Sequence, residues 1–198
     1  HVPETVITNE YLSTLMDTNN EWIVERTGIQ ERRWIDPAID TVANMAAKAS
    51  RMALRRAGLV EKDIDFIVFA TITPDYFFPG SGVLLQRELG LDGKIAAMDI
   101  RNACSGFIYA LSVADQFIKT GMYNNVLVVG AEIQSTALDI STRGRNTAVI
   151  FGDGAGAVVL QPANSPGSLS THLHSDGHFA EELYVKDPGS SRPHNERQ

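Results

Sequence analysis

The chain has 198 residues, 43% of them hydrophobic and 21% charged, and its formal net charge is −7. These proportions are typical of a globular protein, and the negative charge argues against nucleic acid as the main partner, because phosphate binding needs a clustered basic surface. No apolar run approaches the roughly 20 residues of a membrane-spanning helix, and we expect neither a membrane partner nor a signal peptide. The chain begins His-Val-Pro-Glu and lacks an initiator methionine.

The first third of the chain predicts three helices. Residues 9–16 and 20–26 have the pattern of short helices, and Gly28 ends the second one. Residues 41–57 form the clearest helical pattern, because apolar side chains recur on one face until Gly58 ends the run.

The middle of the chain alternates strands with helices. A continuous apolar run over 65–72 predicts a strand buried on both faces. A second buried strand is expected over 95–100 and a further strand over 126–131, with helices over 81–89 and 104–120 that end at glycines. This order implies crossover connections and a mostly parallel sheet covered by helices on both faces, which is an α/β fold.

The last part of the chain divides at a turn-rich break over 161–167. Before it, residues 148–151 and 155–160 flank a glycine-rich turn and predict two strands or a bulged hairpin. After it, residues 168–174 fit one more strand, and 187–198 have no apolar periodicity and are expected to be loop or disorder. We therefore expect one domain over 1–163 and the truncated start of a second over 164–198.

Cys104 is the single cysteine, which excludes an internal disulfide and makes a reducing cytoplasm the expected location. It lies where the strand over 95–100 ends and a helix begins, and ligands of parallel sheets bind beyond such strand ends. The N–H groups and dipole of a helix N-terminus favour thiolate over thiol. Because its neighbours Ala103, Ser105 and Gly106 are small, we interpret Cys104 as a nucleophile rather than a core residue.

Trp22 and Arg26 form a second candidate site. They are four residues apart and share a helix face, so a nucleotide base stacked on Trp22 would have its phosphate near Arg26. From the residues alone, a core tryptophan beside a solvated arginine is the favoured alternative. Arg143 fits equally well as a cation at the mouth of a site and as a solvated loop residue.

Two other motifs suggest ligand binding only weakly. Residues 151–157 (FGDGAGA) lack the Lys-Ser/Thr of a phosphate-binding P-loop, so a tight, closely packed turn is the better interpretation. Residues 172–178 hold three histidines and one aspartate, yet no Cys or Glu completes a ligand set. We expect a polar strand end there and no metal site.

Together these segments resemble the beta-ketoacyl-[acyl-carrier-protein] synthase III family of thiolase-like condensing enzymes. The matching stretches are 17–29 (DTNNEWIVERTGI), 104–121 (CSGFIYALSVADQFIKTG), 151–160 (FGDGAGAVVL) and 170–177 (STHLHSDG). The resemblance runs to about Tyr184 and covers the family's N-terminal half and the start of its C-terminal half. It implies about half of a layered αβαβα architecture, assembled as a homodimer.

The resemblance also implies an acyltransferase reaction. Cys104 would take an acyl group from acyl-CoA and condense it with malonyl-acyl-carrier protein, releasing CoA and CO2, which starts fatty-acid synthesis. Acyl-CoA is then a substrate, and no cofactor is permanently bound. Trp22 and Arg143 match the pair that sandwiches the CoA adenine, with Thr18 and Arg26 near the nucleotide. Phe78 matches a residue that closes the acyl pocket across the dimer, although Phe77 is adjacent and the chain is one residue longer before Cys104.

Parts of the family pattern are missing. Decarboxylation there depends on a His and an Asn of the second half, and nothing after Tyr184 supplies their motifs. The three histidines over 172–178 belong to another family segment, and the family's first strand is missing ahead of His1. We therefore expect a fragment that does not complete condensation alone. The alternatives are a related enzyme of ketide, alkylquinolone or long-chain head-to-head condensation, a non-catalytic acyl-CoA-binding half, and, less favoured, a cysteine hydrolase.

Overall fold

A computed structural model describes residues 1–165 and 167–185 of the chain. The chain divides into two compact units, His1–Gly167 and Ser168–Gln198. The strands of the first unit are β1 (Thr5–Thr8), β2 (Glu31–Trp34), β3 (Phe66–Ala70), β4 (Ala96–Ile100), β5 (Val126–Glu132) and β6 (Gly154–Leu160). Its α-helices are α1 (Asn9–Ser13), α2 (Asn20–Thr27), α3 (Val42–Ala57), α4 (Ser81–Leu89), α5 (Gly106–Lys119) and α6 (Arg145–Ala148).

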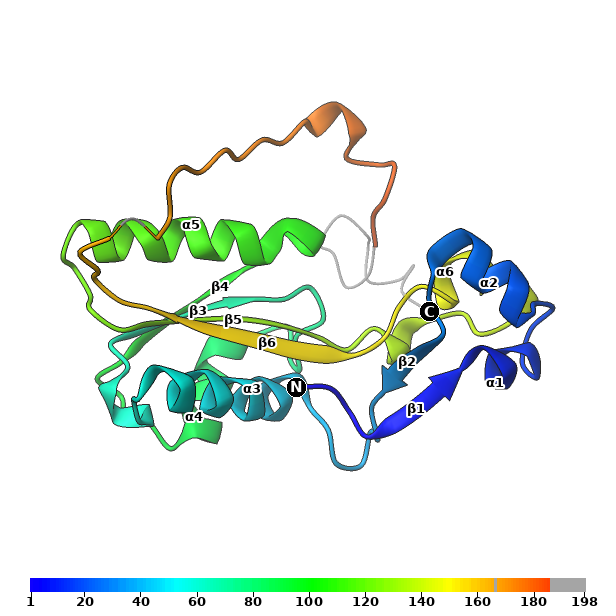
Figure 1. Cartoon of the computed structure of the whole chain (residues 1–198), viewed down its shortest axis with the longest axis horizontal. Helices are drawn as coiled ribbons and strands as arrows, with labels where there is room; N and C mark the ends of the chain where they lie inside the picture. The colour runs from blue at the N-terminus through cyan, green and yellow to red at the C-terminus, as the bar shows by residue number, and fades with distance from the viewer. Residues whose placement is uncertain (166, 186–198) are drawn as a thin grey trace, which may run out of the picture. The chain divides into compact units, whose positions relative to one another are not determined.

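A four-stranded sheet in the order β4-β3-β5-β6 forms the centre of the first unit. Strands β4, β3 and β5 are parallel, and β6 runs antiparallel to β5. Helix α5 covers one face of this sheet, and α3 and α4 cover the other (Figure 1). The predicted α/β fold, with a mostly parallel sheet between helices, is confirmed.

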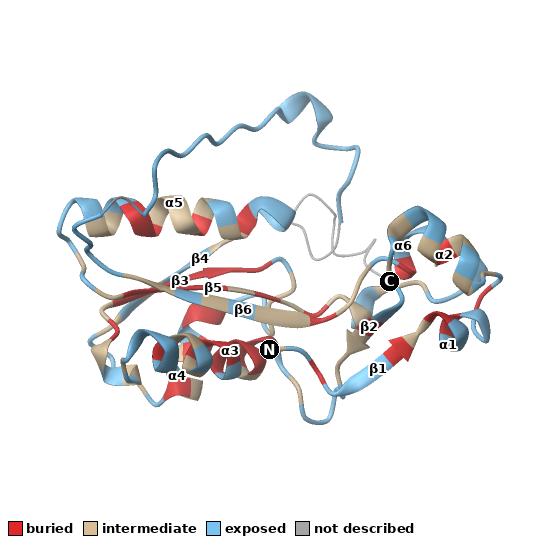
Figure 2. Ribbon diagram, in the orientation of Figure 1, coloured by how far each residue is buried: buried red, intermediate tan, exposed pale blue. Residues whose placement is uncertain are grey.

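Burial is greatest in the two central strands. All five residues of β3 are buried, and so are most residues of β5 (Figure 2). Side chains of these strands alternate between two apolar clusters, one beneath α3 and α4 and one beneath α5. Because each central strand contributes to both clusters, its sequence is apolar throughout rather than alternating.

The main helices begin and end where local sequence signals place them. Thr41 caps α3 because its hydroxyl accepts a hydrogen bond from the backbone N–H of Asn44, and the Asn44 side-chain oxygen accepts one from the backbone N–H of Thr41. Gly58 ends that helix with a left-handed φ of 71°, a conformation that glycine adopts without steric cost. The predictions over 20–26, 41–57 and 81–89 are therefore confirmed to within one residue at either end.

Strand β4 differs from its prediction, because it is not buried on both faces. Its residues are exposed or half-buried, and it forms one edge of the sheet with only β3 beside it. The prediction was wrong because an apolar run reports the character of a strand and not the number of its neighbours. The apolar side chain of Met98 is consequently exposed along this edge.

The predicted strand over 148–151 is also wrong. This segment begins at the last residue of helix α6 and continues as a turn, and β6 pairs with β5 instead. Ala148 and Val149 are buried in an apolar cluster with Leu12 and Ile23, which explains the apolar run without a strand. A short apolar run does not distinguish a buried helix end from a strand.

Strands β1 and β2, together with α1, α2 and α6, form a smaller lobe, hereafter the β1–β2 lobe, beyond one end of the sheet (Figure 1). Strand β5 ends at Glu132, and the chain then passes through short turns into α6. The lobe therefore lies on the side of the sheet where the parallel strands have their carboxyl ends.

The second unit is described by itself over Ser168–Val185. Its residues are exposed, and its one regular element in this range is a 3-10 turn over Gly177–Phe179. The strand predicted over 168–174 is not formed there. The predicted loop over 187–198 lies outside the described residues. None of the helices within the described part of the chain is long and apolar enough to cross a membrane.

Candidate active site

Cys104 lies in a tight turn four residues beyond the carboxyl end of β4. It is the middle residue of a 3-10 turn over Ala103–Ser105, and α5 begins only at Gly106. The prediction that the helix starts at the cysteine is therefore wrong by two residues. Ala103 has a left-handed φ of 47°, which is uncommon for a residue with a Cβ. The free thiol is exposed, so this turn presents the sulfur to a reactant instead of packing it.

Two close approaches hold α5 against the sheet behind the cysteine. A Cβ on Gly106 would lie 3.3 Å from the Cβ of Ala70 at the end of β3. A Cβ on Gly130 would lie 3.2 Å from the Phe107 ring. The absence of side chains at these glycines lets the first turn of α5 rest directly on β3 and β5. The N-terminal amides of α5 are thereby fixed next to the Cys104 turn.

Glu132 holds the loop that follows β3, which lies, like Cys104, at the carboxyl ends of the parallel strands. Its carboxylate accepts hydrogen bonds from the Ile72 amide at 2.9 Å, from the Thr73 amide at 3.1 Å and from the hydroxyls of Thr71 and Thr73. The Thr73 hydroxyl in turn accepts a bond from the amide of Ile133. Sequence reasoning missed Glu132, since nothing in its spacing reveals donors that lie sixty residues away.

Phe78, predicted to close an acyl pocket, lies further along this loop and is 81% exposed. Phe77 is also exposed, and its ring lies 5.8 Å from the guanidinium carbon of Arg101. A cis peptide bond joins Phe78 to Pro79. Within one chain, the two phenylalanines thus form an exposed apolar surface near the exposed edge of β4.

Trp22 lies in a cationic setting in the β1–β2 lobe. The guanidinium carbon of Arg26 is 4.6 Å from the centre of the Trp22 ring, and that of Arg145 is 4.7 Å away. Both distances are within the range of cation–π interaction. Arg145 also donates a hydrogen bond to the backbone carbonyl of Asp17. The structure thus brings Trp22 and Arg26 together, as the sequence predicted, and adds Arg145.

Arg143 points to a different partner. Its guanidinium lies 2.7 Å from the carboxylate of Asp139, and its side chain is 89% exposed. Hydrogen bonds from the side chain and backbone of Ser141, and then from Arg143, lower the pKa of Asp139 to about 2. Arg143 therefore lies beside Asp139, and its role opposite Trp22 on the CoA adenine stays a prediction. It is Arg145, two residues further on, that lies beside the ring.

Thr18 lies two residues before the start of α2, and its side chain retains hydrogen-bonding capacity. Its hydroxyl oxygen is buried and has no hydrogen-bond partner in the described part of the chain. The neighbouring Asp17 amide donates to the Thr142 hydroxyl at 2.9 Å, which joins the segment before α2 to the segment before α6. An unpaired buried hydroxyl is costly unless a ligand or water completes it.

The glycine-rich segment is closely packed at Gly152 but passes into β6 at Gly154, so the turn predicted over 151–157 is wrong for its second half. The segment also contains an unpredicted buried carboxylate. A Cβ on Gly152 would lie 3.0 Å from the Cβ of Arg32. Asp153 is buried and accepts bonds from the amides of Ile35, Gln134 and Ser135 and from the Ser135 hydroxyl. It thereby ties the chain after β2 to the chain after β5, which joins the β1–β2 lobe to the sheet.

The histidine-rich segment brings one histidine and its aspartate into contact with each other. His172 contacts the Ser170 hydroxyl at 3.2 Å, and His178 contacts Asp176 at 2.7 Å. Over residues 1–165 and 167–185, no group of three or more His, Cys, Asp and Glu side chains is arranged to hold a metal ion.

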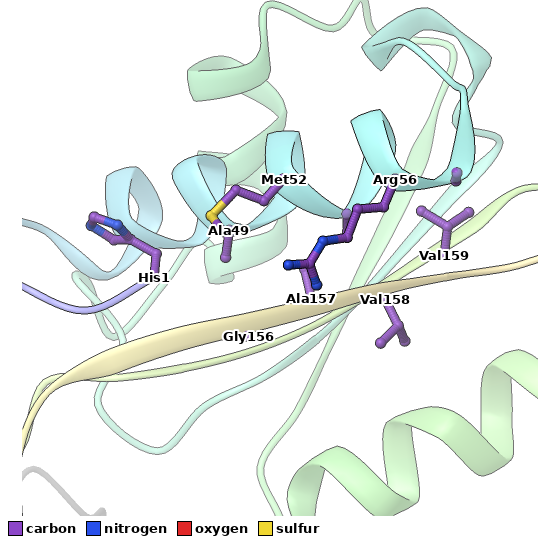
Figure 3. Close-up of a pocket in the computed structure, with 10 residues that line it drawn as sticks. His1, Ala49, Met52, Arg56, Gly156, Ala157, Val158 and Val159 are labelled. Atoms are coloured by element: carbon purple, nitrogen blue, oxygen red, sulfur yellow. The ribbon is translucent and has the colours of Figure 1, made fainter.

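A groove of about 460 Å³ lies along the free edge of β6, between that strand and α3 (Figure 3). Its lining includes Met52 of α3 and Ala157 and Val158 of β6, and the Arg56 side chain extends from α3 toward β6. His1 pairs with Ala155 through two backbone hydrogen bonds at this edge. Cys104 follows β4, the opposite edge of the sheet, so this groove is separate from the candidate active site.

Known proteins share both the sequence and the fold of this chain. The model of the family described as 3-oxoacyl-[acyl-carrier-protein (ACP)] synthase III matches residues 98–177. The beta-ketoacyl-[acyl-carrier-protein] synthase III of Methylococcus capsulatus is 50% identical over 191 residues, which are 96% of this chain and 58% of that protein.

Two solved structures agree with this match. The synthase III of Aquifex aeolicus VF5 is 47% identical with a TM-score of 0.79, over 83% of this chain and 52% of that one. The synthase III of Thermus thermophilus is 41% identical with a TM-score of 0.86, over 93% of this chain and 56% of that one.

The helix-covered mixed sheet with a cysteine beyond the end of one strand is the fold of the solved synthase III structures, which are thiolase-like. Over the part that it spans, the chain is similar to the beta-ketoacyl-[acyl-carrier-protein] synthase III family. The chain spans about half the length of the curated relatives that it matches.

Proposed function

We propose that the protein is an acyltransferase that accepts an acyl group from acyl-CoA on Cys104 and condenses it with malonyl-acyl-carrier protein. The observation that carries the proposal is the exposed cysteine in the turn between β4 and α5. Relatives that share about half of their residues with this chain are named for this synthase activity.

The first half-reaction can be written from the chain's own groups. The Cys104 thiolate attacks the thioester carbonyl, forming a carbon–sulfur bond and a tetrahedral oxyanion. The oxyanion collapses, the bond to the CoA sulfur breaks, and CoA leaves as its thiolate. Backbone amides of the Cys104 turn and of the first turn of α5 are the donors available to the oxyanion. The product is an acyl-cysteine thioester.

In the second half-reaction, malonyl-acyl-carrier protein loses CO2, and the resulting carbanion attacks the acyl-cysteine thioester. This step also needs the His and Asn that the family pattern places in its second half, so we do not assign it to this chain alone. The new carbon–carbon bond yields a 3-oxoacyl-carrier protein and returns the Cys104 thiolate. Acyl-CoA acts throughout as a substrate, and no permanently bound cofactor belongs to the proposal. Because the cysteine must stay reduced to react, a cytoplasmic location also belongs to it.

We infer that Trp22, Arg26 and Thr18 bind the nucleotide of CoA and that Arg145 takes the place predicted for Arg143. Support comes from the two guanidiniums within 4.7 Å of the Trp22 ring and from the unpaired Thr18 hydroxyl. A planar guanidinium can stack on an adenine as well as on an indole and can pair with phosphate.

We also infer a homodimer formed through the exposed edge of β4. The exposed apolar side chains of Met98, Phe77 and Phe78 lie on or near this edge, and an open strand edge readily pairs with another strand. In such a dimer Phe78 would leave solvent and contact the partner, in keeping with its predicted role in the acyl pocket.

The test of the proposed function is the acylation of Cys104. Incubation of the protein with acetyl-CoA should add one acetyl group, located on Cys104 by peptide mass spectrometry, and should release free CoA. Cys104→Ser should retain the fold by circular dichroism and form no thioester. Acetylation elsewhere, or CoA release that persists in Cys104→Ser, would contradict the proposal.

A further inference from the structure

Arg32 is a buried cation in the β1–β2 lobe, and its partners are all neutral. It is 6% exposed, and burial lowers the pKa of its guanidinium. It donates to the Ile7 carbonyl at 3.2 Å, to the Asn9 side-chain oxygen at 2.8 Å and to the Val149 carbonyl at 2.8 Å. Its Nε has no partner in the described part of the chain.

Burying such a cation is expensive. A charge removed from water is normally compensated by an opposite charge, and apolar side chains often replace buried charges without loss of stability. No ion pair to Arg32 is formed by residues in the described ranges. The arrangement therefore calls for an explanation other than stability, and the rigid fork of the guanidinium offers one.

The fork joins the two helices that carry the candidate nucleotide site. One arm reaches Val149, the residue that follows the last residue of α6, and α6 begins with Arg145. The other arm reaches the fully buried Asn9, whose amide donates to the side chain of Asn20 at 3.0 Å. Asn20 is the first residue of α2, the helix that carries Trp22 and Arg26.

We propose that Arg32 is a positioning residue that sets the spacing between α2 and α6, and so between Trp22 and Arg145, for binding of the CoA nucleotide. The inference rests on the proposed function, since it assumes that this pair receives the adenine. Arg32 itself touches neither substrate nor the reacting sulfur. Its effect should therefore fall on nucleotide affinity and not on the chemistry at Cys104.

The test compares two acyl donors that differ only in the nucleotide. Acetyl-CoA and acetyl-pantetheine present the same thioester, but only the first reaches Trp22. In Arg32→Met, the KM for acetyl-CoA in Cys104 acylation and the Kd for CoA should rise about tenfold, within the range for changes along a coupling network. The rate of acylation by acetyl-pantetheine should stay within about twofold. Arg32→Lys keeps the charge but loses the forked guanidinium, so its KM for acetyl-CoA should lie between those of the unmodified protein and Arg32→Met.

Two further variants separate positioning from general damage. Asn20→Ala removes the link to α2 from a partly exposed position and should raise the KM for acetyl-CoA in the same direction. Arg33→Met is the matched control, because Arg33 is the next residue of β2 and its side chain contacts the Pro3 and Glu4 carbonyls and the Glu31 carboxylate, none of which belongs to α2 or α6. This control should change neither the KM for acetyl-CoA nor the rate of acylation by acetyl-pantetheine.

The outcomes separate the two proposals. Equal losses for both donors in folded Arg32→Met and Asn20→Ala proteins, or an unchanged Kd for CoA, would overturn the positioning role and leave the proposed function standing. If the unmodified protein uses acetyl-CoA no better than acetyl-pantetheine, the nucleotide site fails and the positioning role falls with it. If the variants use acetyl-CoA less well but acetyl-pantetheine equally well, both the nucleotide site and the positioning role of Arg32 are supported.

Discussion

Replacing Asp153 with asparagine tests how the β1–β2 lobe is attached to the sheet. One carboxylate oxygen accepts the amides of Gln134 and Ser135, and the other accepts the Ile35 amide and the Ser135 hydroxyl. In Asp153→Asn the NH2 group should replace the oxygen that faces Ile35 and the Ser135 hydroxyl, because that hydroxyl can rotate and accept a hydrogen bond from it. The Ile35 N–H then has no acceptor.

The magnitude follows from this accounting. A buried N–H left unpaired costs about 1–3 kcal/mol, and bonds to a charged acceptor are stronger than bonds to a neutral one. Asp153→Asn should therefore lower the free energy of unfolding by about 2–4 kcal/mol. Asp153→Ala, which removes all four acceptor contacts, should lower it further.

Urea unfolding followed by circular dichroism measures this difference, with Asp92→Asn as the control. Asp92 is an exposed aspartate whose carboxylate accepts the Lys94 amide at 3.1 Å, so its change should stay within about 0.5 kcal/mol. If Asp153→Asn and Asp92→Asn unfolded at the same urea concentration, Asp153 would not hold the lobe in the way described.

Three other predictions follow from the site and its surroundings. Trp22→Ala and Arg145→Ala should each weaken CoA binding in a titration, the first by roughly 1–3 kcal/mol, whereas an equal or larger effect of Arg143→Ala would return that role to Arg143. Asp139 should titrate by NMR with a midpoint of about 2. Because folding lowers the pKa of this carboxyl, its contribution to stability is present above the unfolded value of 3.8 and is lost as the pH falls through 2. A midpoint near 3.8 would contradict the Ser141 and Arg143 contacts. Sedimentation should show a dimer that Met98→Lys converts to monomer, and an unchanged sedimentation coefficient would exclude the β4 edge as the interface.

The sequence was most informative where structure depends on neighbouring residues. Helix ends at Gly58 and Gly90 depend on a single left-handed residue, and the thiol turn follows from small residues at a strand end. The burial of β4 and the segment over 148–151 were mispredicted, because both depend on what packs against an apolar run. An apolar run in the sequence does not reveal how many strands or helices pack against it.

The polar framework of the site was the least predictable part. Glu132 and Asp153 each collect backbone amides from segments that are distant in the chain, so no spacing rule marks them. Arg143 and Arg145 are two residues apart and chemically identical, and only the packing of α6 decides which of them lies beside Trp22. Matching a motif identified the loop, and the choice between its two arginines stays a prediction.

The candidate nucleotide site and the thiol lie on different parts of the molecule, so the distance between them depends on how those parts are joined. The thiol turn belongs to the sheet, whereas Trp22 belongs to the β1–β2 lobe, and Asp153 is one of the groups that link them. Under the proposed function, a thioester held by its nucleotide end would reach the sulfur across a distance that the lobe sets. Donors whose flexible arm is shorter or longer than this reach would bind and still react slowly, so the attachment of the lobe would select substrates by the length of their arm.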